Sequence, residues 1–167
     1  EWNHDYDISG KKVAVVGTGA SAVQIVPNII DKVKELTLFQ RTAAWIIHKP
    51  DRKMTKVEKW LFKHIPFIQK LYRWRVYWQN EMTAIILVYR PKLTKYVQKL
   101  GEMQLKRGIK NPELRQKLTP SYSIGCKRIL PSNYFYPALE KENAHLHVEG
   151  IERITEKGIL DKNGKET

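Results

Sequence analysis

The sequence predicts an α/β fold with a parallel sheet, a helical insertion and a C-terminal β-hairpin. Three observations predict this fold. An apolar, β-branched run over 11–17 leads into a glycine-rich turn, a helix and a second short strand over 36–40. From about 52 to 118 the apolar residues have helical spacing, and the stretch 151–160 alternates around a turn. We expect these parts to form one domain over 1–167.

Composition limits the class of protein. With 167 residues, 42% of them hydrophobic and 28% charged, the chain can bury a core and is not of the disordered type. The single Cys126 excludes an internal disulfide and a multi-cysteine zinc site, and we expect it to be a small buried residue. There is no apolar run of about 18 residues and no visible signal peptide. Because the chain lacks an initiator methionine and stops in a turn-like Asn163-Gly164, we expect a piece of a longer protein. We expect that protein to be cytoplasmic, with membrane association left open.

The first strand ends in the motif Gly17-x-Gly19-x-x-Ala22. Gly17 would make the tight turn, Gly19 would let backbone amides approach a pyrophosphate, and Ala22 would allow the helix to pack closely on the strand. The spacing that follows predicts a helix to about Lys34, whose N-terminus favours phosphate. Because such crossovers are right-handed, the two strands become parallel neighbours in a Rossmann-like sheet. The motif therefore predicts a dinucleotide site.

The end of the second strand predicts which dinucleotide binds. NAD sites place a carboxylate about 20 residues after the glycines, whereas NADP sites use an arginine for the 2′-phosphate. Here the strand runs into Gln40-Arg41-Thr42, without a carboxylate. The Arg41 guanidinium can pair with a phosphate through its planar fork, and Thr42 can add a hydroxyl. We therefore expect NADP rather than NAD.

The middle of the chain, 54–118, predicts three or four helices that interrupt the sheet. Its apolar residues recur at helical spacing, and Pro66, Pro91 and Pro112 divide the pattern. After Gly125 we expect a loop and a strand, then a short helix within 133–143 and a strand over 146–148.

The net charge of +13 is unevenly distributed. The stretch 49–78 holds nine lysines and arginines against two acidic residues, with aromatic residues interleaved. Such a stretch can bind single-stranded nucleic acid or lie on an anionic membrane, but charged runs are usually solvated faces. We expect an amphipathic helical region with its aromatic residues packed inward. Nucleic acid is disfavoured because no binding motif accompanies the stretch, and peripheral membrane contact stays an open alternative.

Two histidines lie on one predicted strand, His145 and His147. Their spacing turns both rings to one face of the sheet. A metal site would need further ligands, and the sequence fixes no carboxylate nearby. We therefore expect no metal.

Three blocks of the chain carry a family resemblance. The first runs from 7 to 24 and contains the glycine motif, the second is Phe39-Gln40-Arg41-Thr42, and the third is Gly125-Cys126-Lys127-Arg128 followed by 132–139. Together they resemble the NADPH-binding domain of class B flavoprotein monooxygenases of the Baeyer–Villiger type, over nearly the whole chain. The region 50–118 carries little motif and is similar to the helical insertion that these enzymes place in this domain.

The resemblance implies roles for the residues that match the family's motifs. The pyrophosphate and nicotinamide end would be lined by Gly17, Thr18, Gly19, Ala20, Ser21 and Gln24. The adenosine 2′-phosphate would be held by Arg41, Thr42 and Lys127. Arg128 matches the family's active-site arginine beside the flavin, where a permanently charged guanidinium stabilises developing negative charge.

The resemblance also implies the parts with which this chain works. We expect NADPH here, FAD bound mainly by the FAD-binding domain of the parent chain, and a ketone or soft heteroatom compound as the substrate of oxygen transfer. The 167 residues alone are expected to be inactive. Two alternatives stay open: the nucleotide domain of another flavoprotein with two dinucleotide domains, and a non-enzymatic basic–aromatic module for anionic membrane or nucleic acid.

Overall fold

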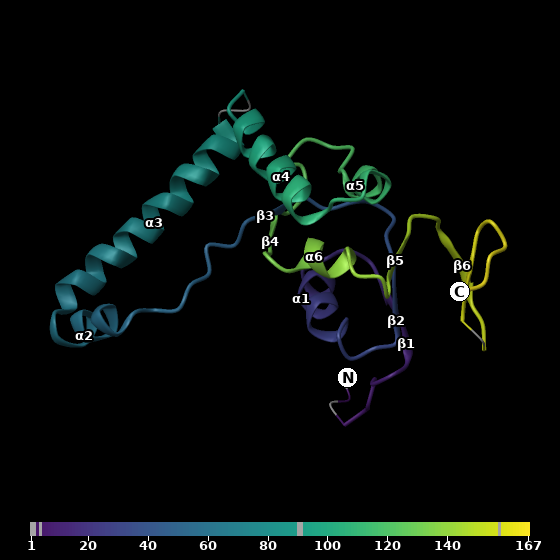
Figure 1. Ribbon diagram of the computed structural model, residues 1–167. Helices are drawn as coiled ribbons and strands as arrows, with labels where there is room; N and C mark the ends of the chain where they lie inside the picture. The colour runs from purple at the N-terminus through teal and green to yellow at the C-terminus, as the bar shows by residue number, and fades with distance from the viewer. Residues whose placement is uncertain (1–2, 4, 90–91, 157) are drawn as a thin grey trace.

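A three-stranded parallel sheet lies at the centre of the computed structural model, which describes residues 3, 5–89, 92–156 and 158–167 (Figure 1). The strands β1 (Lys12–Val16), β2 (Glu35–Phe39) and β5 (Ala144–His147) lie side by side in that order. Val16 is aligned with Phe39, and Phe39 with His147, so the carboxyl ends of all three strands reach the same edge. The predicted α/β fold with a parallel sheet is confirmed.

The helix α1 (Ala20–Ile29) joins β1 to β2 and is shorter than the predicted helix. The amides of Ile30 and Val33 still bond to Val26 and Ile29 respectively, but the chain there is already in a turn. Both side chains are buried. Because the apolar spacing continues into the turn, the sequence pattern overestimates the helix.

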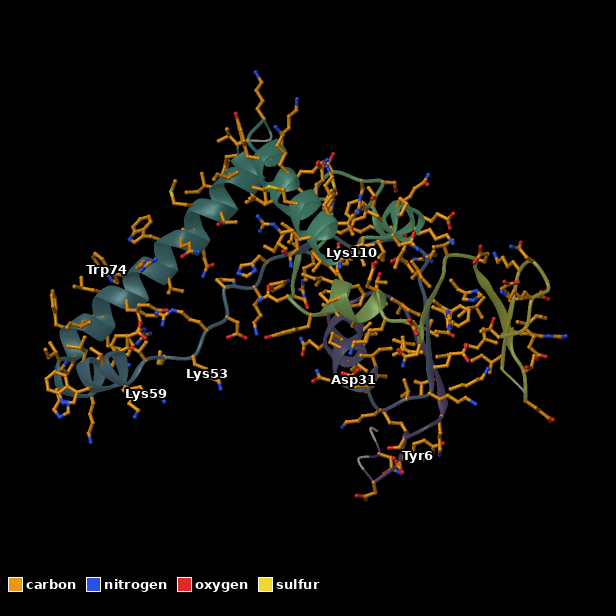
Figure 2. All side chains as sticks on the ribbon, in the orientation of Figure 1. Tyr6, Asp31, Lys53, Lys59, Trp74 and Lys110 are labelled. Carbon is orange, nitrogen blue, oxygen red and sulfur yellow. The ribbon has the colours of Figure 1, made fainter. Side chains whose placement is uncertain are left out.

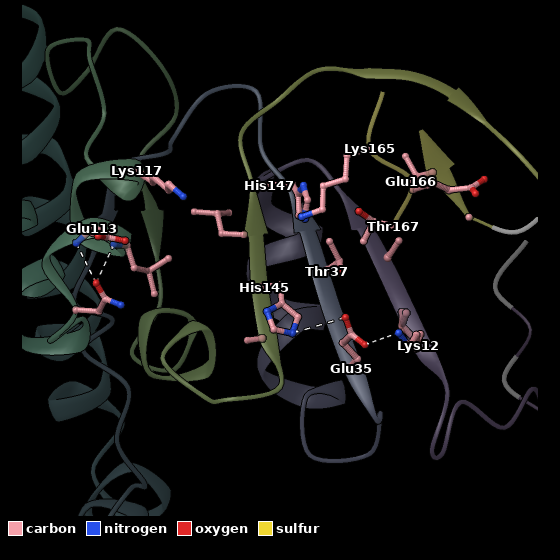
Figure 3. Close-up of a pocket in the computed structure, with 18 residues that line it drawn as sticks. Lys12, Glu35, Thr37, Glu113, Lys117, His145, His147, Lys165, Glu166 and Thr167 are labelled. Atoms are coloured by element: carbon pink, nitrogen blue, oxygen red, sulfur yellow. Dashed lines mark hydrogen bonds and ion pairs between the residues drawn. The ribbon is translucent and has the colours of Figure 1, made fainter. Parts of the chain in front are cut away.

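One face of the sheet is covered and the other is open. The helices α1 and α6 (Phe135–Leu139) pack over the covered face, where Leu36, Leu38 and Phe135 are almost fully buried. On the other face Lys12, Glu35 and His145 line a shallow cavity (Figure 3). The apolar run over 11–17 is typical of a buried parallel strand, but this expectation is wrong, because β1 alternates between exposed and half-buried residues. A parallel sheet needs a second layer to be buried on both faces, and the described residues supply only one.

Within 54–118 the described residues form four helices, at the upper limit of the predicted number. They are α2 (Lys56–His64), α3 (Pro66–Tyr89), α4 (Thr94–Gly108) and α5 (Pro112–Leu118). Two of the expected prolines begin α3 and α5, where a missing amide hydrogen costs nothing; Pro91 lies outside the described residues. The short strands β3 (Ile46–Ile47) and β4 (Leu130–Pro131) pair in parallel beside α4.

The helices α2 and α3 pack on each other and project away from the sheet (Figure 1). We call residues 56–89 the α2–α3 arm. Most of its aromatic residues face solvent: Trp60, Phe67 and Trp74 are between 57% and 69% exposed, whereas Phe62 is half-buried. Figure 2 shows Trp74 and Lys59 extending from the arm. The expectation that the aromatic residues pack inward is therefore wrong. None of the described helices combines the length and apolar character needed to cross a membrane.

The C-terminal hairpin is present, with β6 (Ile151–Ile154) antiparallel to β7 (Ile159–Asp161). Its last residue, Asp161, is only 3% exposed. The Asp161 Oδ1 accepts hydrogen bonds from the amides of Asn163 and Lys165, both at 2.9 Å. The buried carboxylate thus fixes the turn that follows β7.

Candidate dinucleotide site

A cleft of about 530 Å³ lies at the carboxyl ends of β1 and β2. It is lined by five of the ten residues that the sequence assigned to a site: Gly17, Thr18, Arg41, Thr42 and Lys127. Ligands of open α/β sheets bind at this edge, outside the carboxyl ends of the strands. The structure therefore brings the glycine turn, the end of β2 and the Lys127 loop together where a dinucleotide would bind.

The glycine turn has the backbone that the motif requires. Gly17 has a φ of +96°, which favours glycine, and its amide donates to the carbonyl of Phe39 at 2.8 Å. Gly19 caps α1 with an extended backbone and no side-chain hydrogen bond, and the first turn holds no acidic residue. The amides of that turn thus stay available for an anion.

The space beside both glycines is open, which suits a bound dinucleotide. A Cβ atom added to Gly17 or Gly19 would meet nothing within 4 Å. A pyrophosphate could therefore approach the backbone directly, as the fingerprint motif demands. The residues present fit the cofactor that the motif predicts.

A hydrogen bond ties the glycine turn to the end of β2. The Thr18 hydroxyl donates to the carbonyl of Thr42 at 3.0 Å, across 24 residues of sequence. This bond holds Arg41 and Thr42 beside the turn. It also uses the hydroxyl hydrogen of Thr18, which leaves the Thr18 oxygen as an acceptor toward any ligand.

Four charged residues line the cleft, and positive charge is in excess. Arg41, Lys127 and Lys162 are cations, whereas Glu149 is the one acidic residue in the lining. The Lys127 ammonium lies 4.7 Å from the ring centroid of Tyr122, a cation–π contact that steadies its long side chain. An excess of two positive charges matches a phosphate monoester, which carries nearly two negative charges at neutral pH.

One residue of the cleft lining, Gln40, has a buried side chain with an unsatisfied acceptor. Gln40 is 3% exposed, and its Nε2 donates to the carbonyl of Lys117 at 2.8 Å. Its Oε1 is buried without a hydrogen-bond partner among the described residues. Such an orphaned acceptor is costly unless a ligand or water donates to it. Sequence reasoning placed Gln40 at the strand end but gave it no role.

The other five predicted site residues lie outside this lining. Four of them, Gly19, Ala20, Ser21 and Gln24, belong to the exposed N-terminal part of α1, and the fifth is Arg128. All five are exposed. Their predicted roles therefore stay predictions. Sequence reasoning missed Glu149, Gly150 and Lys162, because their approach to the cleft depends on how the hairpin docks.

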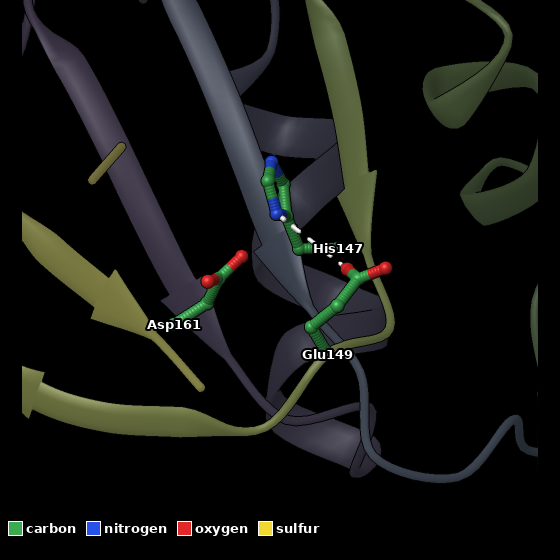
Figure 4. A group of neighbouring side chains, drawn as sticks. All are labelled: His147, Glu149 and Asp161. Carbon is green, nitrogen blue, oxygen red and sulfur yellow. Dashed lines mark ion pairs between the residues drawn. The ribbon is translucent and has the colours of Figure 1, made fainter. Parts of the chain in front are cut away.

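Carboxylates lie close to both histidines of β5, contrary to the sequence analysis. The His147 Nδ1 is 3.8 Å from an oxygen of Glu149, and the His145 Nε2 is 3.6 Å from an oxygen of Glu35. Figure 4 shows Asp161 completing a group with His147 and Glu149, whose potential ligand atoms lie within 4.8 Å of one another. The Asp161 carboxylate already accepts hydrogen bonds from the hairpin turn. We therefore interpret the three residues as a structural group that stabilises the hairpin, and not as metal ligands.

Cys126 is exposed, which corrects the expectation of a buried thiol. Its amide donates to the carbonyl of Ser123 at 3.2 Å, so the residue lies in a surface turn rather than in the core. Its neighbour Lys127 reaches the cleft from this turn.

Comparison with solved structures defines the class of fold. A steroid monooxygenase described as oxidized and bound to NADP matches 99% of this chain and 39% of its own, with a TM-score of 0.80 and 21% identity. A complex of OTEMO with FAD and NADP matches 95% of this chain and 37% of its own, with a TM-score of 0.76 and 23% identity. At these identities the likeness shows the shared fold. No protein-family model matches the chain.

A curated relative makes the assignment more specific. The Baeyer–Villiger monooxygenase of Pseudomonas aeruginosa is 48% identical over 166 residues, which cover 99% of this chain and 32% of the relative. The chain thus spans about a third of the length of that enzyme. The resemblance to Baeyer–Villiger-type flavoprotein monooxygenases is confirmed: this chain corresponds to one segment of such an enzyme.

Proposed function

We propose that this chain is the NADPH-binding part of an FAD-dependent monooxygenase that transfers oxygen to ketones or soft heteroatoms. The observation that carries the proposal is the cleft where the glycine turn meets Arg41, Thr42 and Lys127. The solved relatives described as bound to NADP, or to FAD and NADP, support the same cofactors here.

In this proposal the glycine turn and the end of β2 recognise different parts of NADPH. The open backbone at Gly17 and Gly19 and the free amides of α1 receive the pyrophosphate. Arg41, Thr42 and Lys127 receive the 2′-phosphate, and the bidentate fork of Arg41 supplies the selectivity over NADH. Ser21 and Gln24 extend along α1 toward the nicotinamide end.

The chemistry itself belongs to the bound cofactors and to the rest of the enzyme. NADPH supplies a hydride, and FAD, bound mainly by the FAD-binding domain of the parent chain, activates dioxygen. The residues of this chain bind and orient NADPH. The exposed Arg128 is free to approach the flavin from this side, where its fixed charge stabilises developing negative charge. The 167 residues alone would therefore bind NADPH without oxidising it.

The proposal is tested by titrating the intact protein, meaning the full-length parent chain that includes these 167 residues, with NADPH and with NADH. We expect NADPH to bind at least about tenfold more tightly, because a charge-assisted phosphate contact contributes roughly 1.5–3 kcal/mol. Equal affinities, or a preference for NADH, would contradict the assignment. In a parallel oxygen-electrode assay, the FAD-loaded intact protein should consume NADPH and dioxygen, whereas the 167-residue chain should consume neither.

We further propose peripheral contact between the α2–α3 arm and an anionic membrane. Lysines and arginines are interleaved with exposed Trp60, Phe67, Trp74 and Trp78 along its two helices. Exposed aromatic side chains gathered on two helices in this way mark an interaction surface, and each lysine or arginine near an anionic surface contributes about 1 kcal/mol. The charge selects an acidic lipid surface over a second, equally basic copy of the arm.

Vesicle co-sedimentation tests this contact. We expect the intact protein to bind vesicles of phosphatidylcholine with phosphatidylglycerol, and to be released from them by salt. Tyr77→Ala on the arm should weaken binding, whereas Tyr134→Ala, an exposed tyrosine outside the arm, should not. If the protein binds neutral and anionic vesicles equally, or neither, the membrane proposal fails and the arm is covered by another part of the parent protein.

A further inference from the structure

We propose that Lys162 is a third cation for the 2′-phosphate of NADPH, and that Gly150 positions it. The proposal rests on the function proposed above. Lys162 follows β7 and lines the same cleft as Arg41 and Lys127. The three cations come from three separate segments: the end of β2, the surface turn at Lys127 and the C-terminal hairpin.

The backbone of Lys162 is fixed at the mouth of the cleft. Its amide donates to the carbonyl of Gly150 at 2.9 Å, which ties the hairpin to the segment leaving β5. The preceding residue, Asp161, donates its own amide to the carbonyl of Lys165 at 3.0 Å. Figure 4 shows Asp161 and Glu149 on these two segments, on either side of His147. Lys162 and Gly150 are the residues that follow them, and the backbone hydrogen bond between the two holds the segments together.

The stem of the Lys162 side chain lies against Gly150. A Cβ atom added to Gly150 would come within 3.2 Å of both Cδ and Cε of Lys162. The absence of a side chain at Gly150 thus leaves the room in which the stem lies. Since the backbone of Lys162 is fixed and its stem has Gly150 on one side, fewer conformers are open to the ammonium before it binds a phosphate.

The charge of the cleft supports an anionic ligand of high charge. Without Lys162 the lining would carry two cations and Glu149, whereas with Lys162 the excess is two positive charges. The cavity on the open face of the sheet is different, because its three lysines are matched by three glutamates. Lys165, three residues beyond Lys162, lines that cavity instead. The hairpin therefore contributes Lys162 to the dinucleotide cleft and Lys165 to the cavity on the open face. Of these two lysines, Lys162 is the one that lies in a lining with an excess of positive charge.

The experiment compares the dissociation constants of NADP⁺ and NAD⁺ for intact protein carrying Lys162→Met, with Lys165→Met as the matched control. We expect Lys162→Met to weaken NADP⁺ about tenfold and to leave NAD⁺ within about twofold. Lys165→Met should change neither constant. Gly150→Ala, which displaces the lysine stem, should weaken NADP⁺ by a smaller factor and leave NAD⁺ unchanged. The probes 2′,5′-ADP and 5′-AMP should repeat the pattern.

Two other results for Lys162→Met would overturn the inference, and each has a different meaning. Equal losses for NADP⁺ and NAD⁺ would place Lys162 at the pyrophosphate, and an unchanged NADP⁺ constant would remove it from the site. The reference variant Arg41→Ala separates the two proposals. If Arg41→Ala lowers the preference for NADP⁺ and Lys162→Met does not, only the present inference fails. If neither variant alters that preference, the assignment of the cleft fails as well.

Discussion

The dinucleotide cleft and the α2–α3 arm both contain cations, but the protein holds these cations in different ways. In the cleft, Arg41, Lys127 and Lys162 come from distant segments and converge on one concavity. In the arm, the cations and aromatic residues are neighbours in sequence and point outward from two exposed helices. Convergence requires a fixed backbone, which the cleft obtains from the bond between Thr18 and Thr42 and from that between Lys162 and Gly150. This difference is the one that our two proposals require, a selective small-molecule site in one region and a broad contact surface in the other.

A pair of phenylalanine substitutions tests the difference in packing and should give the largest effect. Phe135 is 1% exposed beneath the sheet, whereas Phe67 is 65% exposed on the arm. We expect Phe135→Ala to lower the free energy of unfolding by about 3–5 kcal/mol. Phe67→Ala should change it by no more than about 0.5 kcal/mol. Urea denaturation measures both, and comparable losses would show that the arm is packed in solution.

A smaller loss of stability is expected from a substitution at Gly108, where α4 packs against the core. A Cβ atom at Gly108 would lie 2.5 Å from the Cβ of Tyr136, which cannot move without its backbone. Gly108→Ala should therefore lower the free energy of unfolding by about 1–3 kcal/mol, as overpacking does. Lys99→Ala, at an exposed position of the same helix, is the control. If the two variants are equally stable, α4 does not pack closely against Tyr136.

The two glycines of the turn should separate stability from binding. Gly17→Ala places a side chain at a φ of +96°, so we expect a loss of roughly 1–2 kcal/mol in the free energy of unfolding. Gly19 has a φ of −74° and open space around it, so Gly19→Ala should leave stability nearly unchanged. It should nevertheless weaken NADPH and NADH alike, because the new methyl group occupies the space assigned to the pyrophosphate. Unweakened binding in Gly19→Ala would move the pyrophosphate elsewhere.

The smallest effect is expected in the first turn of α2, in the titration of the Glu58 carboxyl. The side-chain hydrogen bond from Arg52, followed by that from the Thr55 amide, lowers the pKa of Glu58 from 4.5 to about 2. Because the pKa is lowered on folding, the contribution of Glu58 is complete above about pH 4.5 and is lost as the pH falls toward 2. Carboxyl NMR should place the Glu58 midpoint near 2, and Arg52→Met should raise it. A midpoint near 4.5 in the unsubstituted protein would mean that this end of α2 is frayed.

The parts of the fold that depend on neighbouring residues could be predicted from the sequence. The strand, glycine turn, helix and second strand are encoded within about 30 residues, and so are Arg41 and Thr42 at the strand end. The places of Lys162 and Gly150 in the cleft could not be predicted, because they depend on the docking of distant segments. The same holds for the burial of the Gln40 amide, which bonds to the distant Lys117. The exposure of the arm could not be predicted either, since an apolar pattern does not say whether another surface covers it.

The central claim is that the end of β2 selects NADP through its 2′-phosphate, and Arg41→Ala tests it most directly. The measurement is the ratio of the dissociation constants for NAD⁺ and NADP⁺ in the intact protein, with Arg41→Lys as the variant that keeps the charge but loses the fork. The account predicts that Arg41→Ala weakens NADP⁺ by at least about tenfold while NAD⁺ stays within about twofold, with Arg41→Lys in between. Equal losses for the two nucleotides would contradict it.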